Sequence, residues 1–360
     1  MSERVVIFTG GTGGHVIPAV NFGNFLLSKG FECILILDKR GFKYINDFSG
    51  QIYILDSSHL SGNVLFKIKS LISLSIFFIK SVYLLIKIKP SKCISFGSYA
   101  TFMPLLSILI LRFFIKIKIY LHEQNSVIGK VNLFFLPYAK YIFSNFENIK
   151  NLKSIYKHKK FYVGLPSKLN IKPHNFKINK NHKKENIFLY GGSQGSLSLI
   201  NIFLSIIERV NKNILNNLKL FIQAPETSSK IIGKKLKALE IDFEIKSFYQ
   251  NIDEILSITD IAITRAGSGT INDLIYFKIP SMILPLPQSI YNHQYYNAKF
   301  LSDKKGAILL DEKNINIDKI VSDFNKLIID YNLRRNMKQV LESIYIPDSN
   351  KLILEKIFYE

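Results

Sequence analysis

Two groups of polar residues in the first half of the sequence could carry out acid–base chemistry. His15 ends the glycine-rich loop Gly10-Gly11-Thr12-Gly13-Gly14, and His122-Glu123-Gln124-Asn125 follows a predicted strand at residues 117–121. Imidazole has an unperturbed pKa of about 6.5, which suits a general base near neutral pH. We therefore predict that His15 is the catalytic base, with orientation of substrate or backbone as its alternative role. His122 is a second candidate.

Regular structure is predicted on both sides of the first glycine loop. The apolar run Val5–Thr9 predicts a buried strand, and the apolar spacing from Val16 to Ser28 predicts a helix. Between a strand and a helix, glycine amides and the helix dipole form a binding site for phosphate or diphosphate. The spacing is not Gly-x-Gly-x-x-Gly, and Asp38 is the only acidic candidate for a ribose contact, so a plain dinucleotide-binding fold is disfavoured.

The second half of the chain repeats this opening pattern. Residues 186–190 predict a strand, residues 191–195 (Gly-Gly-Ser-Gln-Gly) form a glycine turn, and a helix follows from Ser196. Because 360 residues are enough for two hydrophobic cores, the repeat predicts two α/β domains rather than one long sheet. Residues 168–186, rich in Lys, Asn and His, are expected to connect them.

A third glycine loop lies further along the second half. The predicted strand Asp260–Thr264 leads into the segment 265–270 (Arg-Ala-Gly-Ser-Gly-Thr) and then a helix expected from Ile271. Backbone amides of residues 268–270 at the helix start are expected to bind a phosphate. Asp273, expected in the first turn, is either a ligand of ribose hydroxyls or a cap of that helix.

The composition and net charge of the chain limit the classes of molecule that it is expected to bind. The formal net charge is +21, so the surface should attract nucleotide phosphates or an acidic lipid surface. Nucleic acid is disfavoured because the lysines are scattered and no binding motif accompanies them. Cys33 and Cys93 lie in apolar runs and make no disulfide framework, which suits a reducing cytoplasm. Since the chain enters a strand by Val5, no signal peptide is expected.

Two apolar segments are candidates for contact with a membrane. Residues 65–89 form a nearly unbroken apolar run in which Lys69, Ser73, Lys80 and Lys87 fall on one narrow helical face. An interfacial helix therefore fits better than a membrane span, and an ordinary core helix with solvated lysines is the alternative. In residues 105–119, Arg112, Lys116 and Lys118 interrupt a second apolar run.

Motifs at four separated places together resemble one family. They are the first glycine loop with His15, the His-Glu-Gln-Asn segment 122–125, the loop 191–195, and the helix start with Gln294, Asn297 and Ala298. The chain resembles the MurG family of peptidoglycan N-acetylglucosaminyltransferases over essentially its whole length. The resemblance implies the GT-B architecture, an α/β fold with two Rossmann-like doubly wound domains facing across a cleft. Residues 1–164, with helix 347–360 packed back on them, would receive the acceptor and face the membrane, and residues 165–346 would bind the UDP-sugar donor.

The resemblance also implies the reaction. N-acetylglucosamine would move from UDP-N-acetylglucosamine, with inversion, to the C4 hydroxyl of undecaprenyl-pyrophosphoryl-MurNAc-pentapeptide, which converts lipid I to lipid II. The protein would work peripherally at the cytoplasmic face of the bacterial inner membrane, alongside other cell-wall enzymes. Rivals are a glycolipid transferase with a diacylglycerol acceptor, a UDP-N-acetylglucosamine 2-epimerase, and a non-enzymatic membrane-binding module. No Asp-x-Asp occurs, so neither a divalent metal nor another cofactor is expected.

Residue by residue, the resemblance implies a donor site in which helix termini and Arg265 stabilise the departing diphosphate, and in which the backbone near Tyr249 contacts uracil. The matching positions are Thr12, Gly13, Gly14, Asn125, Lys168, Ser193, Tyr249, Arg265, Ser268, Gly269, Thr270, Ile271, Asn272, Asp273 and Gln294.

The chain departs from the family pattern at four places. Lys168 stands for an arginine and lacks the guanidinium fork that can bind two oxygens at once. Asp273 stands for a glutamate, Ser98 for a glycine and His293 for a glutamine. These changes bear on donor affinity more than on the type of reaction.

Overall fold

The computed structural model describes residues 3–55, 64–167, 184–191 and 197–360, with no side-chain description for 64–71. The chain divides into two compact units, Met1–Lys168 with Ile346–Glu360, and Leu169–Tyr345. Three predictions fall outside the described residues: Lys168 with most of the expected connection, Ser193 with its glycine turn, and the side chain of Lys69.

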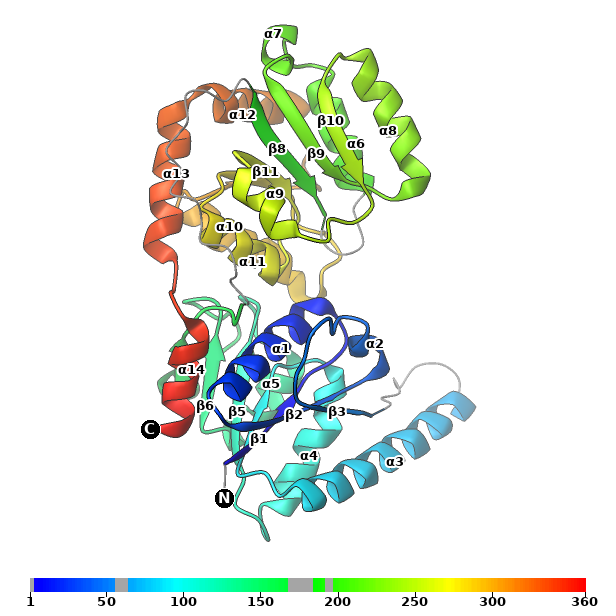
Figure 1. The fold of residues 1–360 in the computed structure, drawn as a ribbon, viewed down its shortest axis with the longest axis vertical. Helices are drawn as coiled ribbons and strands as arrows, with labels where there is room; N and C mark the ends of the chain where they lie inside the picture. The colour runs from blue at the N-terminus through cyan, green and yellow to red at the C-terminus, as the bar shows by residue number, and fades with distance from the viewer. Residues whose placement is uncertain (1–2, 56–63, 168–183, 192–196) are drawn as a thin grey trace. The chain divides into compact units, whose positions relative to one another are not determined.

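Within the described residues, the first unit contains a parallel sheet of order β3-β2-β1-β4-β5-β6-β7 (Figure 1). Its strands are β1 (Arg4–Phe8), β2 (Glu32–Leu37), β3 (Gln51–Ile54), β4 (Lys92–Ser95), β5 (Lys118–Glu123), β6 (Tyr141–Ser144) and β7 (Lys160–Tyr162). On β1, Val6 pairs with Ile34 of β2 and Cys93 of β4. The chain direction across the sheet reverses between β1 and β4, so the sheet is doubly wound, with its topological switch point there.

Helices cover both faces of this sheet because side chains alternate along each strand. Val5 and Ile7 pack with α1 and α14, whereas Val6 and Phe8 pack with α3, α4 and α5. The helices of this unit are α1 (Gly13–Ser28), α2 (Lys39–Phe42), α3 (Val64–Ile88), α4 (Phe102–Leu111), α5 (Lys130–Phe135) and α14 (Ser349–Phe358), with 3-10 turns at Tyr99–Thr101, Leu136–Tyr138 and Ser154–Lys159.

The C-terminal helix α14 is held to the first unit by apolar and polar contacts. The rings of Phe358 and Phe31 lie 4.1 Å apart, and the Tyr120 hydroxyl donates to the carbonyl of Ile357 at 3.3 Å. Ile353 is fully buried in the same core as α1. The last residues of the chain therefore belong to the core of the first unit.

The second unit is built in the same way. Its described strands form a parallel sheet of order β10-β9-β8-β11-β12-β13, with a switch point between β8 and β11. The strands are β8 (Glu185–Tyr190), β9 (Leu218–Gln223), β10 (Asp242–Lys246), β11 (Ile261–Thr264), β12 (Ser281–Ile283) and β13 (Ile308–Leu309). The helices are α6 (Leu197–Ile207), α7 (Lys212–Leu215), α8 (Glu226–Ala238), α9 (Ile252–Ile258), α10 (Ser268–Phe277), α11 (His293–Asp303), α12 (Ile317–Ile329) and α13 (Tyr331–Ile344), with a 3-10 turn at Ile290–Asn292.

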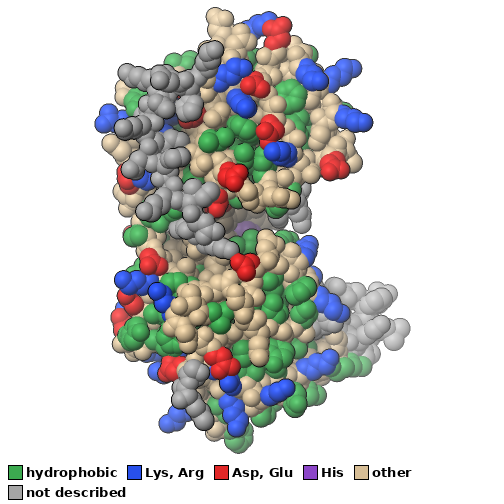
Figure 2. All heavy atoms as spheres, in the orientation of Figure 1, with side chains coloured by type: hydrophobic (Ala, Val, Ile, Leu, Met, Phe, Trp, Pro, Cys, Tyr) green, Lys and Arg blue, Asp and Glu red, His purple; other side chains and the backbone are tan. Residues whose placement is uncertain are grey.

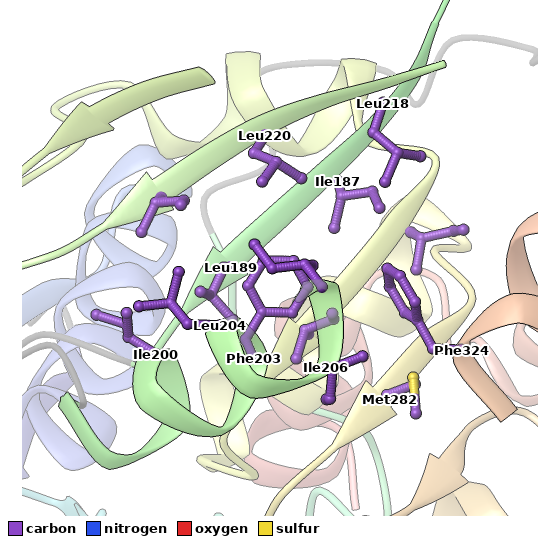
Figure 3. Packing of buried hydrophobic residues seen from close by; sticks show 14 of the residues in the cluster. Ile187, Leu189, Ile200, Phe203, Leu204, Ile206, Leu218, Leu220, Met282 and Phe324 are labelled. Atoms are coloured by element: carbon purple, nitrogen blue, oxygen red, sulfur yellow. The ribbon is translucent and has the colours of Figure 1, made fainter. Parts of the chain in front are cut away.

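The core of the second unit lies between the sheet and the helices α6 and α12. Figure 3 shows Phe203 of α6 among the strand residues Ile187, Leu189 and Leu220. The ring of Phe203 meets that of Phe324 edge-on, with centroids 5.9 Å apart. Burying one such side chain contributes about 1.5–3 kcal/mol, so this cluster stabilises the unit substantially.

Candidate active site

The first glycine loop needs glycine for steric reasons. Gly10 has φ +156° and Gly11 φ +78°, and a Cβ on Gly10 would lie 2.7 Å from both Ala100 and the Asp38 carboxylate. Thr12 is the N-cap of α1, so the amides of Gly13 and Gly14 belong to the first turn and have no acceptor inside the helix. These amides, at an exposed end of the helix, can bind an anionic group.

Asp38 supports this loop from the end of β2. Its buried carboxylate accepts from the amides of Gly11 at 2.8 Å and Gly41 at 2.9 Å, and it pairs with Arg40 at 2.8 Å. Burial by itself would raise the pKa of Asp38, but the hydrogen bonds from Gly11, Arg40 and Gly41 outweigh it and lower the pKa. The sequence suggested Asp38 only as a ribose ligand. In the structure its carboxylate instead holds the glycine loop.

His15 is oriented by two acceptors from other strands. Its Nδ1 lies 2.9 Å from the carbonyl oxygen of Phe96 and 2.8 Å from Oε1 of Gln124. Because both partners accept, Nδ1 carries the proton, and in the neutral ring Nε2 is then unprotonated. In its neutral form the half-buried His15 therefore has its basic nitrogen at Nε2, near the carboxyl ends of β1, β4 and β5.

His122 occupies a different environment. Its side chain is 0% exposed and stacks on the ring of Phe96 at 4.9 Å. Burial lowers the pKa of His122 to about 3, although the hydrogen bond of Nε2 to the carbonyl of Gly164 at 3.2 Å opposes this. A buried neutral ring with both nitrogens bonded inside the protein is out of reach of a substrate hydroxyl. The structure therefore argues against His122 as a base.

Asn125 follows β5 in a loop that Glu123 organises. The buried carboxylate of Glu123 accepts from the amides of Asn125 at 3.1 Å and Gly129 at 2.9 Å, and from the Asn132 side chain at 2.9 Å. Asn125 itself is half-buried. The first unit thus brings the residues after β1 together with those after β5, although more than one hundred positions separate them in sequence.

The N-terminus of α10 is the candidate phosphate site of the second unit. The helix begins at Ser268 with Gly267 as N-cap, so the expected start at Ile271 is wrong, and the Ile271 amide already donates to the Gly267 carbonyl at 2.9 Å. Amides of residues 268–270 have no acceptor within the helix. A Cβ on Gly269 would meet nothing within 4 Å, so packing does not require glycine there and a ligand could approach the backbone.

Asp273 lies in the second turn of α10. The expectation that it caps this helix is wrong, because the earlier start of the helix places Asp273 beyond its first turn. Burial, and then the nearby charge of Asp253, raise the pKa of Asp273 to about 8. Its side chain, which is half-buried, can therefore carry a proton near neutral pH and then donate a hydrogen bond as well as accept one. Asn272 beside it is half-buried.

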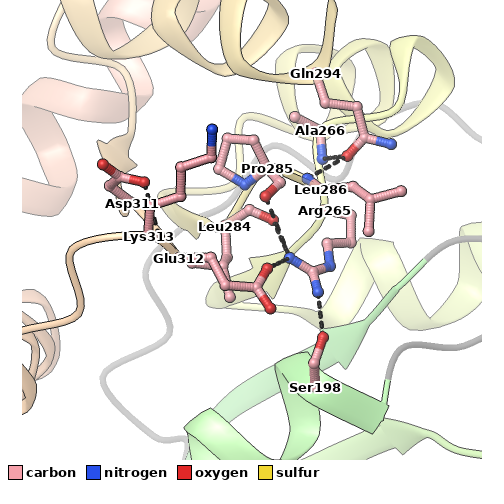
Figure 4. A network of polar contacts seen from close by, with 10 residues as sticks. All are labelled: Ser198, Arg265, Ala266, Leu284, Pro285, Leu286, Gln294, Asp311, Glu312 and Lys313. Carbon is pink, nitrogen blue, oxygen red and sulfur yellow. Dashed lines mark hydrogen bonds and ion pairs between the residues drawn. The ribbon is translucent and has the colours of Figure 1, made fainter. Parts of the chain in front are cut away.

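Arg265 lies in a buried network that joins four segments (Figure 4). Its guanidinium is 4% exposed and donates to Glu312 at 2.6 Å, to the carbonyl of Leu284 at 3.0 Å, and to Ser198. Because these partners all lie inside the protein, the structure does not support the expectation that Arg265 binds the departing diphosphate directly. The physical reason is its depth, since a buried guanidinium needs a buried counter-charge, which Glu312 supplies.

Gln294 and Tyr249 were also expected at the site for the UDP-sugar donor, and contacts with neighbouring segments hold both side chains in place. Oε1 of Gln294 accepts from the amides of Leu286 at 2.9 Å and Ala266 at 3.3 Å, so it braces the loop before α10 (Figure 4). Tyr249 is buried and packs edge-on against Phe188 at 5.3 Å, which leaves its backbone rather than its ring for a ligand.

Together these features define a class. Two doubly wound parallel sheets, the first with a histidine after a glycine loop and the second with an open helix N-terminus, are typical of GT-B-like glycosyltransferases. The glycosyltransferase family 28 N-terminal domain matches residues 5–144, and the family 28 C-terminal domain matches residues 186–345. The predicted fold class and enzyme class are confirmed.

Curated relatives narrow this class to one family. The UDP-N-acetylglucosamine–N-acetylmuramyl-(pentapeptide) pyrophosphoryl-undecaprenol N-acetylglucosamine transferase of Rickettsia canadensis is 36% identical over 329 residues, 91% of each chain. The protein of the same name from Rickettsia bellii is 34% identical over 94% of each chain. The chain belongs to this transferase family.

Solved structures agree with the fold. The crystal structure of MurG from Acinetobacter baumannii has a TM-score of 0.82 over 99% of this chain and 100% of that chain, at 21% identity. A UDP-GlcNAc 2-epimerase from Neisseria meningitidis has a TM-score of 0.68 at 15% identity. The epimerase alternative thus shares the fold, but the sequence relatives are the transferases and do not favour it.

Proposed function

We propose that this protein transfers N-acetylglucosamine from UDP-N-acetylglucosamine to the C4 hydroxyl of the lipid-linked N-acetylmuramyl-pentapeptide, as the names of its relatives describe. One structural observation carries the chemistry. Phe96 and Gln124 accept from Nδ1–H of His15, so the neutral ring has its basic nitrogen at Nε2, beside the glycine loop. A glycolipid transferase acting on diacylglycerol is not favoured, because the relatives over nine-tenths of the chain name the peptidoglycan precursor.

The proposed reaction is a single displacement. The acceptor hydroxyl oxygen attacks the anomeric carbon and forms the new glycosidic bond as the bond from that carbon to the diphosphate oxygen breaks. Nε2 of His15 takes the hydroxyl proton, and UDP leaves with the electron pair. Attack opposite the leaving group inverts the anomeric configuration. A positioned base of this kind contributes about 10²–10⁴-fold to the rate.

The leaving diphosphate is proposed to bind at the N-terminus of α10. Amides of residues 268–270 point out of the helix, where its dipole places about half a positive charge. Asp273, one helical turn further on, is proposed to bond the ribose hydroxyls. Arg265 would act indirectly, by holding the loop that carries these amides through its contacts with Leu284 and Ser198.

The decisive experiment uses labelled UDP-N-acetylglucosamine with lipid I, and follows label in the lipid product. We expect His15→Ala to lower kcat about 10²–10⁴-fold while UDP binding, measured by calorimetry, is unchanged. His158→Ala is the matched control, because His158 is exposed on a 3-10 turn of the same unit. Near-normal turnover of His15→Ala would show that the base lies elsewhere. Absence of label from the lipid with wild-type protein would contradict the transfer itself.

We also propose peripheral attachment to an anionic membrane through α3, α4 and the segment after α4. On α3, Ile79 and Tyr83 are exposed beside Lys80, and after α4 the rings of Phe113 and Phe114 are 77% and 84% exposed. Figure 2 shows hydrophobic side chains next to Lys and Arg side chains over the first unit. Among the described residues, no helix has the length and apolarity needed to cross a membrane.

Such a surface combines two forces with different salt dependence. Basic residues near an anionic leaflet contribute about 1 kcal/mol each and are screened by salt, whereas apolar insertion is not. We expect Lys80→Gln with Lys87→Gln to weaken binding to anionic vesicles, and Phe113→Ser with Phe114→Ser to remove the part that survives high salt. The control is the pair Lys230→Gln and Lys234→Gln on α8. Unchanged vesicle binding of both first-unit variants would refute this attachment.

The proposed attachment also raises the question of which face of the membrane the protein binds. Cys33 and Cys93 are buried free thiols, which persist in a reducing compartment, so we place the attached protein on the cytoplasmic face of the bacterial inner membrane. Other cell-wall enzymes would be its neighbours there. Protease digestion of intact spheroplasts tests the location, because degradation from outside would place the protein on the opposite face.

A further inference from the structure

The side chain of Gln124 lies between two imidazole rings. Its Oε1 is 2.8 Å from Nδ1 of His15, and its Nε2 is 3.1 Å from Nδ1 of His122. Nε2 also donates to the backbone carbonyl of His122 at 3.1 Å. Because a carbonyl can only accept, this last contact determines which end of the amide is the NH₂ group.

The hydrogen bond between His122 and Gly164 indicates where the protons lie in this network. Nε2 of His122 faces the carbonyl of Gly164 at 3.2 Å and therefore carries a proton. In the neutral ring, Nδ1 of His122 must then accept, which matches the NH₂ group of Gln124. The amide oxygen of Gln124 is left to accept from Nδ1–H of His15, and this agrees with the second acceptor of that N–H, the carbonyl of Phe96.

The neighbouring carboxylate does not take this role. Side chains alternate along β5, and Glu123 points away from His122 and Gln124, toward Gly129 and Asn132. The partner of the candidate base is therefore a neutral amide and not the adjacent acid.

We propose that Gln124 is a positioning residue that, together with the carbonyl of Phe96, holds His15 in the Nδ1–H tautomer, and that buried His122 in turn fixes the orientation of the Gln124 amide. This inference rests on the proposed role of His15 as the base. When Nε2 of His15 takes the acceptor proton, the ring becomes a cation, and Nδ1–H donates more strongly to Gln124 and to Phe96. The contact therefore stabilises the state that forms during the reaction.

Gln124→Met and Gln124→Glu separate this role from simple packing. Methionine has a similar length and can neither accept from His15 nor donate to His122. Glutamate keeps an oxygen that accepts from Nδ1–H of His15 in either protonation state, and its protonated form also donates to Nδ1 of His122. Circular dichroism and thermal melting establish that each variant is folded.

The readouts are the tautomers of the histidine rings and the kinetics. With ¹⁵N-histidine protein, ring NMR shifts should show His15 as Nδ1–H and His122 as Nε2–H in the wild type. In Gln124→Met, Nδ1–H of His15 keeps the carbonyl of Phe96 but loses the amide oxygen, so the share of the Nε2–H tautomer should rise. We expect kcat to fall about 10- to 100-fold with KM for UDP-N-acetylglucosamine unchanged. Gln124→Glu should restore the single tautomer and most of kcat.

Several results would overturn the inference. One is a wild-type His15 in the Nε2–H tautomer, which needs no variant to detect. Another is a Gln124→Met protein with a single Nδ1–H tautomer and normal kcat. Failure of the proposed function is distinguishable, because His15→Ala would then retain turnover while the ring shifts still report whether Gln124 sets the tautomer.

Discussion

Protonation of His122 should set an acid limit to the stability of the first unit. The ring is completely buried, its Nδ1 faces the NH₂ group of Gln124, and burial lowers its pKa to about 3 from an ordinary value of 6.5. A proton on Nδ1 would place two donors against each other. The folded protein therefore binds that proton only near pH 3, whereas the unfolded chain binds it below about pH 6.5.

The direction and size of the change in unfolding free energy with pH follow from this difference in proton binding. Because the unfolded state binds the proton first, His122 leaves stability unaffected above about pH 6.5 and lowers it progressively as the pH falls toward 3. From the two pKa values, the loss at pH 5 relative to neutral pH is about 2 kcal/mol, and at pH 3 it is about 4 kcal/mol.

The assay compares wild type with His122→Gln, whose amide has no titration in this range. Urea unfolding followed by circular dichroism at pH 7.5 and pH 5 gives the stability loss of each protein, and their difference isolates His122 because the other groups titrate in both. We expect wild type to lose about 2 kcal/mol more than the variant. Equal losses, or a His122 ring signal that titrates near pH 6.5, would refute the reasoning.

Three further predictions concern the loops and the leaving group. Ser98 has φ +80° and ψ 151°, a conformation suited to glycine, so Ser98→Gly should raise the free energy of unfolding by about 1 kcal/mol in urea titrations; a decrease would contradict the strain. Glu312→Gln leaves the guanidinium of Arg265 without its counter-charge, and should lower stability by about 3 kcal/mol in the same assay, with a loss below 1 kcal/mol counting against it. Because amides of α10 are proposed to bind the diphosphate, transfer activity should persist after treatment with a chelator, and abolished turnover would contradict that assignment.

Local patterns in the sequence were sufficient to predict many of the strands and helices and the positions of the glycine loops. Val5–Thr9 and residues 186–190 are largely apolar runs of strand length, and β1 and β8 form there within one residue of the expected bounds. Such elements are predictable because side-chain period and chain-breaking glycines act over a few residues. The start of α10 was missed because the apolar periodicity begins at Ile271, whereas the helix begins at Ser268, directly after Gly267.

Only the tertiary structure decided which polar residues meet. Asp38 reaches Gly11 across 27 positions, Gln124 reaches His15 across 109, and Arg265 finds Glu312 across 47. These contacts depend on the order of strands in each sheet and on which face of a strand a residue occupies, and neither is a local property of the sequence. For the same reason the motif 122–125 predicted a site, but it did not show that Gln124 contacts His15 or that His122 is buried. The sequence by itself determined where the glycine loops lie and predicted a base beside the first of them, and the packing of parallel strands determined which residues contact these loops.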